Sequence, residues 1–270
     1  MTAVAGIRPA SSAVSQWWVL TGRLIVPMLR NGEIVVALAA SAAVTASFYA
    51  TLHQLLAGPD LQQSSYGQYL MPLIALQAMS FASVSTAFRA STDSVQGLNR
   101  RFRAMPIALL SPLAARLSAG LCRNAAGLVV ALACGYVIGF RFYRGPLETV
   151  GFCLLALSAG AALAFLADAV GTSSLNPAAA AQWLLLPQLI FGLASVGLQP
   201  VQRFPEWIRP IVRDQPVSQL IYALQALAGD KIPIPNAPTW SVTGPALVWV
   251  VGGIVALLPL AVYLYRRMVT

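Results

Sequence analysis

Residues 147–170, LETVGFCLLALSAGAALAFLADAV, decide the fold of this chain. Between Glu148 and Asp168 this stretch carries no charged side chain. As a helix it is long enough to cross a hydrocarbon core of about 30 Å. Ala156, Gly160 and Ala164 fall along one face, a spacing typical of helices that pack closely in lipid. We therefore predict that these residues span a membrane.

The composition indicates that most of the chain behaves in the same way. Of its 270 residues 58% are hydrophobic and 9% are charged, and the mean hydropathy is +0.72. A soluble domain has roughly 25% charged residues, so one aqueous core could not hide this much apolar surface. We predict a single all-α polytopic membrane domain over residues 1–270. Its six transmembrane helices are expected at 33–56, 69–88, 113–140, 147–170, 178–198 and 242–265.

The basic residues flank these spans and do not form a basic face. The net charge is +9, and the positive-inside rule accounts for it without nucleic acid as a partner. Six spans place both termini on one side, together with Arg266 and Arg267 and the loop after the second span. We expect that side to be the cytoplasm of a bacterial plasma membrane. Arg116 and Arg123, early in the third span, are expected to snorkel towards the same surface.

Two amphipathic segments lie outside the spans. Residues 13–30 carry Trp17, Trp18, Arg23 and Arg30 and are expected to lie as a helix in the headgroup region. A soluble helix packed on a partner is the alternative. Residues 199–240 are rich in proline, and their short amphipathic stretches are too short to cross. We expect them to form re-entrant helices in the outer leaflet.

The chain offers no arrangement of residues typical of catalysis. Its only lysine, Lys231, stands in Gly-Asp-Lys-Ile-Pro, which is not a phosphate-binding loop. Its one histidine, His53, reads as a surface residue near the outer side. The three cysteines form no Cys-x-x-Cys pattern that would predict a metal site. An intramembrane hydrolase is therefore not expected, because no base accompanies a nucleophile.

The loop after the second span reads DSVQGLNRRFRAMP at residues 93–106. Leu98, Phe102 and Met105 are spaced by four and three residues, which places them on one face of a helix. A loop that only connects two spans does not need these apolar side chains. They could insert into a groove on another protein.

Two motifs resemble those of a known family. The acid four residues before Gly97-Leu98, with a proline nine residues after Gly97, resembles the signature of ABC-2-type exporter membrane subunits. Asp93-Ser94 stands where that family usually has Glu-Arg. Gln215-Pro216-Val217-Ser218, with Phe204 and Trp207 before it, resembles the outer re-entrant segment of the daunorubicin-resistance (Drr-type) branch. Residues 67–69, 88–94, 99–102 and 134–142 are similar to mycobacterial Drr-type permeases linked to complex-lipid export.

The resemblance implies half of a transporter. Two permeases, identical or related, would pair among membrane lipids, and each would dock an ABC ATPase that binds MgATP; no cofactor is implied in this chain. The implied coupling residues are Asp93, Gly97, Leu98, Arg100, Arg101, Phe102, Arg103 and Pro106. The implied residues of the outer segment are Phe204, Trp207, Gln215, Pro216 and Ser218. The implied cargo is a complex lipid of the phthiocerol dimycocerosate kind, or a hydrophobic drug.

Asp168 keeps a second hypothesis open. Acids inside a membrane are functional by default, although a hydrated interfacial position near Gly171 would also explain it. An ion-coupled secondary transporter of hydrophobic compounds is the alternative function, and Asp168 is the residue that it would need.

Overall fold

The protein is helical wherever the structure describes it. The computed structural model describes residues 12–30, 66–105, 107–108, 110–229 and 239–269, with a few single positions between 32 and 50. Most of the predicted span 33–56, and His53 within it, therefore lies outside the described residues. The described helices are α1 (Ala13–Arg30), α3 (Tyr66–Val95), α4 (Leu98–Arg103), α5 (Ser111–Val137), α6 (Pro146–Ser173), α7 (Pro177–Leu193), η2 (Val201–Arg203), α8 (Arg209–Asp214), α9 (Pro216–Ala228) and α10 (Thr239–Val269).

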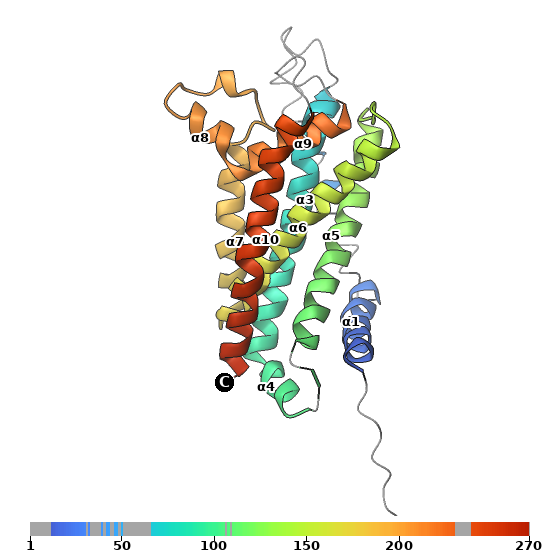
Figure 1. Ribbon diagram of the computed structural model, residues 1–270, viewed down its shortest axis with the longest axis vertical. Helices are drawn as coiled ribbons and strands as arrows, with labels where there is room; N and C mark the ends of the chain where they lie inside the picture. Colours follow the sequence, from blue (N-terminus) through green and yellow to red (C-terminus); the bar gives the residue numbers. More distant parts are fainter. Residues whose placement is uncertain are drawn as a thin grey trace, which may run out of the picture.

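Four of the described helices, α3, α5, α6 and α10, are long and apolar enough to cross a membrane. They run side by side as a bundle, with α4 and the C-terminus at one end and α8 and α9 at the other (Figure 1). We call these the α4 end and the α9 end. The apolar helix α7 has 17 residues, or about 26 Å at the helical rise. The number of six spans stays a prediction.

Several helix ends differ from the predicted spans. The helix predicted to end at residue 88 continues to Val95, and the one predicted over 178–198 ends at Leu193. Polar residues hide the first of these extensions from a hydropathy pattern. Ser91 is fully buried, and its hydroxyl donates to the Ser174 carbonyl at 2.7 Å. The helix therefore continues through residues whose polarity is satisfied inside the protein.

The central helix of the bundle is α3, which contacts α5, α6, α7 and α9. In its most apolar window 83% of the residues are buried, against 11% for α10. The small residues Ala156, Gly160 and Ala164 of α6 are all buried. Gly160 lies between Asn124 of α5 and Met79 of α3, and Ala164 lies against Gly120 of α5. Gly171 lies so close to the Ala87 carbonyl that an added Cβ would collide with it. This close packing leaves the apolar exterior of α10 to face lipid.

The turn between α5 and α6 is tied to the start of α3. The Gln68 amide donates to the Arg141 carbonyl at 2.9 Å and accepts from the Arg141 backbone N–H at 3.0 Å. Phe140 and Phe152 pack beneath this clamp and are fully buried. Gly139, which the sequence places in the third span, lies in the turn after α5 with a φ of +98°.

The segment after α7 folds across the α9 end as η2, α8 and α9 (Figure 1). With 13 residues, α9 is about 20 Å long and too short to span a bilayer. Its buried face carries Ile221, Leu224 and Ala228. In the sequence Phe204, Trp207, Ile208 and Ile211 follow helical spacing, which predicts a helix from Phe204. That prediction is wrong before Arg209, because Phe204 is extended and α8 begins only at Arg209, with a proline in its first turn.

Candidate functional site

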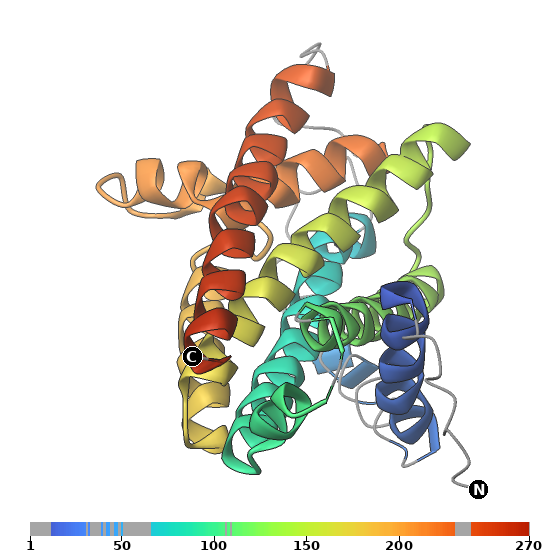
Figure 2. The ribbon, with the colours of Figure 1, turned by 60° about the horizontal axis from the view of Figure 1, so that its bottom comes forward.

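The short helix α4 crosses from α3 to α5 at one end of the bundle (Figure 2). It begins at Gly97, whose φ of +68° lies in the left-handed region. The turn is closed by the Gln96 N–H on the Thr92 carbonyl at 2.9 Å and by the Gly97 N–H on the Ser94 carbonyl at 3.2 Å. A side chain at this φ would cost about 1–2 kcal/mol. Glycine at this position therefore permits the left-handed turn through which α4 leaves α3 without strain.

The apolar residues of α4 and of the turn after it lie on two sides, one facing the protein and one facing outward. Leu98 and Phe102 are half-buried and line a small cavity of about 60 Å³ with Leu20 of α1. The Arg23 guanidinium lies 5.9 Å from the centre of the Phe102 ring, within the range of a cation–π contact. Met105 is 47% exposed. The structure thus places Leu98 and Phe102 against the protein's own α1, and Met105 on the outside.

The other predicted coupling residues lie around this helix. Arg101 is exposed, as is Val95 just before the turn. The side chains of Arg100 and Arg103, and Pro106 as a whole, lie outside the described residues.

The N-terminal helix α1 packs along α5 beside the α4–α5 connection (Figure 2). The Trp17 indole N–H donates to the Ser118 hydroxyl at 3.0 Å. The Gln16 side chain accepts from the Ala108 backbone N–H at 2.8 Å. Trp18 is 69% exposed, so the two tryptophans do not share one face. Arg30 is also exposed. Through Gln16, Trp17 and Arg23, α1 is attached to α4 and to the start of α5.

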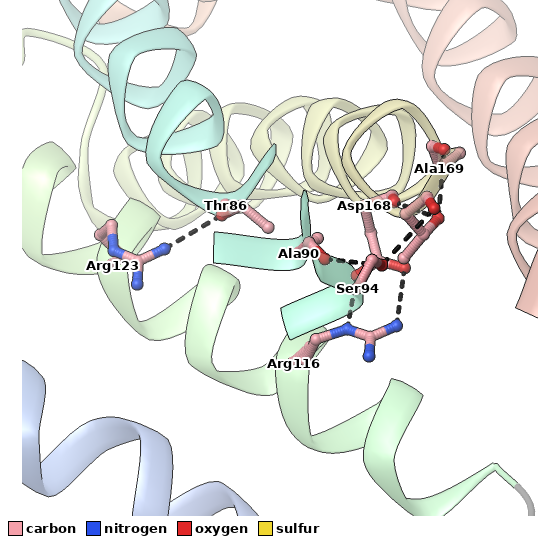
Figure 3. Close-up of polar contacts among 8 residues, drawn as sticks. Thr86, Ala90, Ser94, Arg116, Arg123, Asp168 and Ala169 are labelled. Atoms are coloured by element: carbon pink, nitrogen blue, oxygen red, sulfur yellow. Dashed lines mark hydrogen bonds and ion pairs between the residues drawn. The ribbon is translucent and has the colours of Figure 1, made fainter. Parts of the chain in front are cut away.

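Asp168 of α6 forms a buried ion pair with Arg116 of α5 (Figure 3). The guanidinium binds both carboxylate oxygens, with Nε at 2.7 Å from Oδ1 and Nη2 at 3.3 Å from Oδ2. Asp168 is 1% exposed and Arg116 is 7% exposed. Neither side chain is exposed, so the predicted snorkelling of Arg116 to the surface is wrong, and Asp168 is not hydrated.

The ion pair belongs to a charged cluster drawn from four helices. Arg123 is buried as well, rather than snorkelling, and donates to the Thr86 hydroxyl at 3.0 Å (Figure 3). Asp93 lies between the guanidinium groups, because it lines two small cavities with them. The members of the charged cluster are Arg23, Arg89, Asp93, Arg116, Arg123 and Asp168. Ionisable residues within spans are the sequence signal for such a cluster.

Gln215 and Ser218 of the predicted outer segment fasten α9 to the end of α7. The Ser218 hydroxyl accepts from the Val196 N–H at 3.2 Å and from the Gln215 amide at 3.0 Å. That amide also donates to the Ala194 carbonyl. Helix ends leave backbone groups without partners, and these two side chains satisfy some of those at the end of α7.

The remaining residues of the outer segment have different positions. Pro216 is the first residue of α9, where its missing N–H costs nothing. Phe204 packs against the main core, whereas Trp207 is 76% exposed. In α8 the Arg213 guanidinium binds Asp214 at 2.8 Å, and this hydrogen bond lowers the pKa of the Asp214 carboxyl.

A cavity of about 360 Å³ lies between α3, α6, α7, α9 and α10. Its walls are mainly apolar, with Leu73, Leu163, Trp183 and Phe191 among them. The polar residues on the walls are Gln77, Ser80, Ser83 and Gln188. None of these was singled out from the sequence, because a hydropathy pattern averages an isolated glutamine into the span that contains it.

Comparison with known proteins agrees with this architecture. Residues 29–263 match the family described as ABC-2 family transporter protein. The doxorubicin resistance ABC transporter permease protein DrrB of Mycobacterium tuberculosis is 47% identical over 258 residues, which are 93% of this chain and 89% of that protein. The probable doxorubicin resistance ABC transporter permease protein DrrC of the same species is 32% identical over 199 residues, 73% of this chain and 69% of that protein.

A third relative comes from another genus. The daunorubicin resistance ABC transporter permease protein DrrB1 of Streptomyces coeruleorubidus is 27% identical over 204 residues, 75% of this chain and 69% of that protein. The chain therefore belongs to the ABC-2 family of transporter proteins. Within that family it is a multi-pass membrane permease subunit with Drr-type relatives, which confirms the resemblance read from the sequence.

Proposed function

We propose that this chain is the membrane-spanning half of an ATP-driven exporter that moves a hydrophobic substrate out of the cytoplasm. A separate ABC ATPase binds MgATP and docks at the α4 end, and a second permease, identical or related, completes the membrane core. The α4 end and both termini face the cytoplasm. The observation that carries this proposal is α4 itself, a short helix that connects two long helices at the end of the bundle, with Arg101 exposed on it and Val95 and Met105 exposed on either side of it.

Three structural features support α4 as the element through which the ATPase moves the permease. Gly97 permits the left-handed turn between α3 and α4, and Phe102 contacts Arg23 of α1. The C-terminal part of α10 contacts α4 as well. A push on α4 would therefore reach α1, α3 and α10 together, as a two-state change in the bundle requires.

The exposure of the residues around α4 supports a choice among those that would meet the ATPase. Val95, Arg101 and Met105 are exposed and form the docking surface in this proposal. Leu98 and Phe102 hold α4 on the bundle from the other side. Arg23, Asp93 and Arg116 line a small cavity together with Leu98 and Phe102. Through the Arg116–Asp168 ion pair they would transmit a movement of α4 to α5 and α6.

A charged residue introduced at or beside α4 tests the proposed docking surface. In membranes that contain the permease and its ATPase, Met105→Asp should prevent co-purification of the ATPase and abolish ATP-dependent uptake of doxorubicin into inverted vesicles. Leu175→Asp is the matched control, because Leu175 is exposed and lies in the α6–α7 connection at the same end. Phe102→Asp should abolish transport while the permease remains in the membrane. Co-purification and transport that both survive Met105→Asp and Phe102→Asp would contradict the docking role of α4.

The contacts of Asp168 make an ion-coupled transporter a less favourable interpretation than the sequence alone did. Asp168 is the residue that it would need, and both carboxylate oxygens of Asp168 are bound to Arg116. The pair is a link between α5 and α6, and a proton carrier would have to break it in each cycle. Transport that persists without the ATPase and collapses with an uncoupler would restore this alternative.

The substrate is expected to be a hydrophobic drug or a complex lipid. The first follows from the names of the relatives, which refer to doxorubicin and daunorubicin resistance. The second rests on the likeness to mycobacterial permeases linked to lipids of the phthiocerol dimycocerosate kind. The mainly apolar cavity suits both. Lipid profiling of a deletion strain, beside its doxorubicin sensitivity, separates them.

A further inference from the structure

Helix α9 forms the wall of the apolar cavity at the α9 end. Its residues Pro216, Val217 and Leu220 line the cavity. It runs across the bundle, whereas α3 and α10 run along it (Figures 1 and 2). On α3 the lining includes Leu73, about one helical turn after Tyr69. The cavity therefore ends where the start of α3 meets α9.

The start of α3 and the turn between α5 and α6 form one side of this meeting point. The Gln68 side chain makes two hydrogen bonds to the backbone of Arg141. Gly67 lies so close to the Ile138 carbonyl that an added Cβ would collide with it. These contacts hold the start of α3 and the α5–α6 turn together.

The end of α7 and α9 form the other side. Gln215 and Ser218 attach the beginning of α9 to the end of α7. Gly197, just after α7, packs against Ile221 of α9, whose Cδ1 would lie 2.8 Å from an added Cβ. Helix α9 also packs on α10 and α6. The end of α7, α9 and α10 thus form a second unit beside the start of α3.

Hydrogen bonds at Tyr69, Gln225 and Tyr143 join the two sides. The Tyr69 hydroxyl donates to the Val196 carbonyl at the end of α7. The backbone carbonyl of Tyr69 accepts from Nε2 of Gln225 on α9 at 3.3 Å. The Tyr143 N–H in the α5–α6 turn donates to the Ala228 carbonyl of α9 at 3.1 Å. One residue of α3, Tyr69, therefore holds both the end of α7 and α9.

This arrangement suits a contact that opens and closes. The bond from Gln225 is longer than the usual N–H···O distance of about 2.9–3.0 Å. Tyr69 and Tyr143 lie on the same side of the contact, since Gln68 ties α3 to the turn after α5. A movement of the start of α3 would therefore stretch all of these hydrogen bonds together, while those of Gln68 move with it.

We propose that the contact of Tyr69 with α9 and the end of α7 is the outer gate of the cavity, closed in this structure. When the start of α3 moves away from α9, the hydrogen bonds of Tyr69 and Gln225 break, and the cavity opens towards the α9 end. Helix α9 stays on α10 and the end of α7. This inference rests on the proposed export function and adds to it the place at which the substrate leaves.

A cysteine in the cavity reports whether the gate is open. Ser80 lines the cavity and is 9% exposed, and Ser80→Cys changes its volume little. The permease, with its three native cysteines replaced by alanine, is prepared with its ATPase in membrane vesicles without nucleotide. A membrane-impermeant methanethiosulfonate is added from the side on which Gln202→Cys reacts, because Gln202 is exposed in η2 at the α9 end. The rate of modification at position 80 then measures access to the cavity from that end.

Tyr69→Phe and Gln225→Leu should each raise this rate about five- to tenfold, because each removes one hydrogen bond that holds the gate closed. Gln219→Leu is the matched control on α9 and should not change the rate, because the hydrogen bond of Gln219 to the Arg213 carbonyl is exposed. Unchanged rates in both Tyr69→Phe and Gln225→Leu would overturn the proposal, and so would an equal rise in Gln219→Leu.

A disulfide across the contact tests the gate from the opposite direction. A Cβ at Gly229 would lie 3.1 Å from the Tyr143 Cβ, a little below the roughly 3.5–4.5 Å found in disulfides. The double variant Tyr143→Cys with Gly229→Cys, once oxidised, should lose most of its ATP-dependent doxorubicin uptake into inverted vesicles. Reduction with dithiothreitol should restore it, and this reduced form controls for the side chain introduced at Gly229, whose φ is +87°. Full transport by the cross-linked form would exclude a gate at this contact.

The outcome is separable from that of the export proposal. If Tyr69→Phe and Gln225→Leu open the cavity to the reagent but the wild-type complex moves no substrate on ATP addition, the gate stands and export is refuted. If the wild-type complex transports and the cross-linked form transports equally well, export stands and the gate is refuted.

Discussion

At the scale of single residues, the buried Arg116–Asp168 ion pair links α5 to α6. Each side chain offsets part of the free-energy cost of burying the charge of the other (Figure 3). Removing one member of a buried pair is more harmful than replacing both, because the remaining charge stays in a medium of low polarity. The pair should therefore respond very differently to single and double substitution.

Asp168→Leu alone should lower the free energy of unfolding by about 3–5 kcal/mol, because Arg116 stays buried and loses the carboxylate to which it donates two hydrogen bonds. Arg116→Met together with Asp168→Leu should recover most of that loss. Thermal unfolding of the detergent-solubilised permease measures both. A single variant as stable as the double variant would show that the two residues are not coupled. The exposed pair Arg213 and Asp214 offers a control, since Asp214→Leu there should leave the unfolding temperature unchanged.

The sequence predicts that Asp168 matters but not which residue binds it. Arg116 lies 52 positions away, and the pairing depends on the rotation and depth of two helices in the bundle. Hydropathy fixes neither of these. For the same reason Arg116 and Arg123 read as residues that reach for the surface, although both are buried. Gln77 and Gln188 give no signal from sequence, since only the fold brings them to the wall of one cavity.

At the scale of elements, the angle between α3 and α4 depends on one backbone conformation. Gly97→Ala should cost about 1–2 kcal/mol at the left-handed φ of this position. The strain can be relieved only by moving α4, so ATP-dependent transport should fall more than the amount of folded permease. Transport in inverted vesicles, normalised to permease content, measures this effect.

Gly22→Ala in α1 is the matched control for that substitution. Gly22 lies within a helix and an added Cβ there meets no atom within 4 Å. Alanine should therefore stabilise α1 by about 0.5–1 kcal/mol. A transport defect of the same size in both variants would mean that the conformation of Gly97 is not the cause.

The attachment of α9 to α7 should depend on Gln215 and Ser218. Gln215→Leu leaves the Ala194 carbonyl without that donor, and Ser218→Ala leaves the Val196 N–H without its acceptor. Each change should destabilise this contact by about 1–3 kcal/mol. Amide hydrogen exchange at Val196 and along α9 should rise. Gln219→Leu on the same helix is the control, because its hydrogen bond to the Arg213 carbonyl is exposed. Equal exchange in all three variants would exclude this attachment.

The elements themselves were predictable to different degrees. The cores of α3, α5, α6 and α10 follow from long apolar runs, and α4 follows from the spacing of its apolar residues. The start of α8 was predicted too early, because amphipathic spacing ignores the loss of N–H groups at prolines. The five polar or charged residues among positions 89 to 95 hid the end of α3 from the hydropathy pattern, although a helix can continue through them when tertiary contacts satisfy the side chains.

At the scale of the whole molecule, the two ends of the bundle carry different chemistry. The α4 end holds Arg266 and Arg267 and most of the charged cluster, whereas the α9 end holds the short helices after α7 (Figure 1). By the positive-inside rule we expect the α4 end to face the cytoplasm, as proposed above. A cysteine introduced as Arg267→Cys should react with a membrane-impermeant maleimide only in inverted vesicles.

Gln202→Cys, in η2 at the α9 end, should react only in intact cells. Both variants need a background in which Cys122, Cys134 and Cys153 are replaced by alanine. Labelling of position 267 in intact cells would reverse the proposed orientation and remove α4 from the side where ATP is available.

The continuity of α3 has a mechanical consequence. This helix begins beside the clamp at Gln68 and ends at the turn that carries α4, in 30 residues, or about 45 Å. A rod of that length pivoting near its middle would move each end by about 2 Å for a tilt of roughly 5°. The same tilt would shift Gln68, near the other end, in the direction opposite to α4. One stiff lever would thus convert a small stroke on one side of the bilayer into a movement of the turn between α5 and α6, which Gln68 holds, on the other.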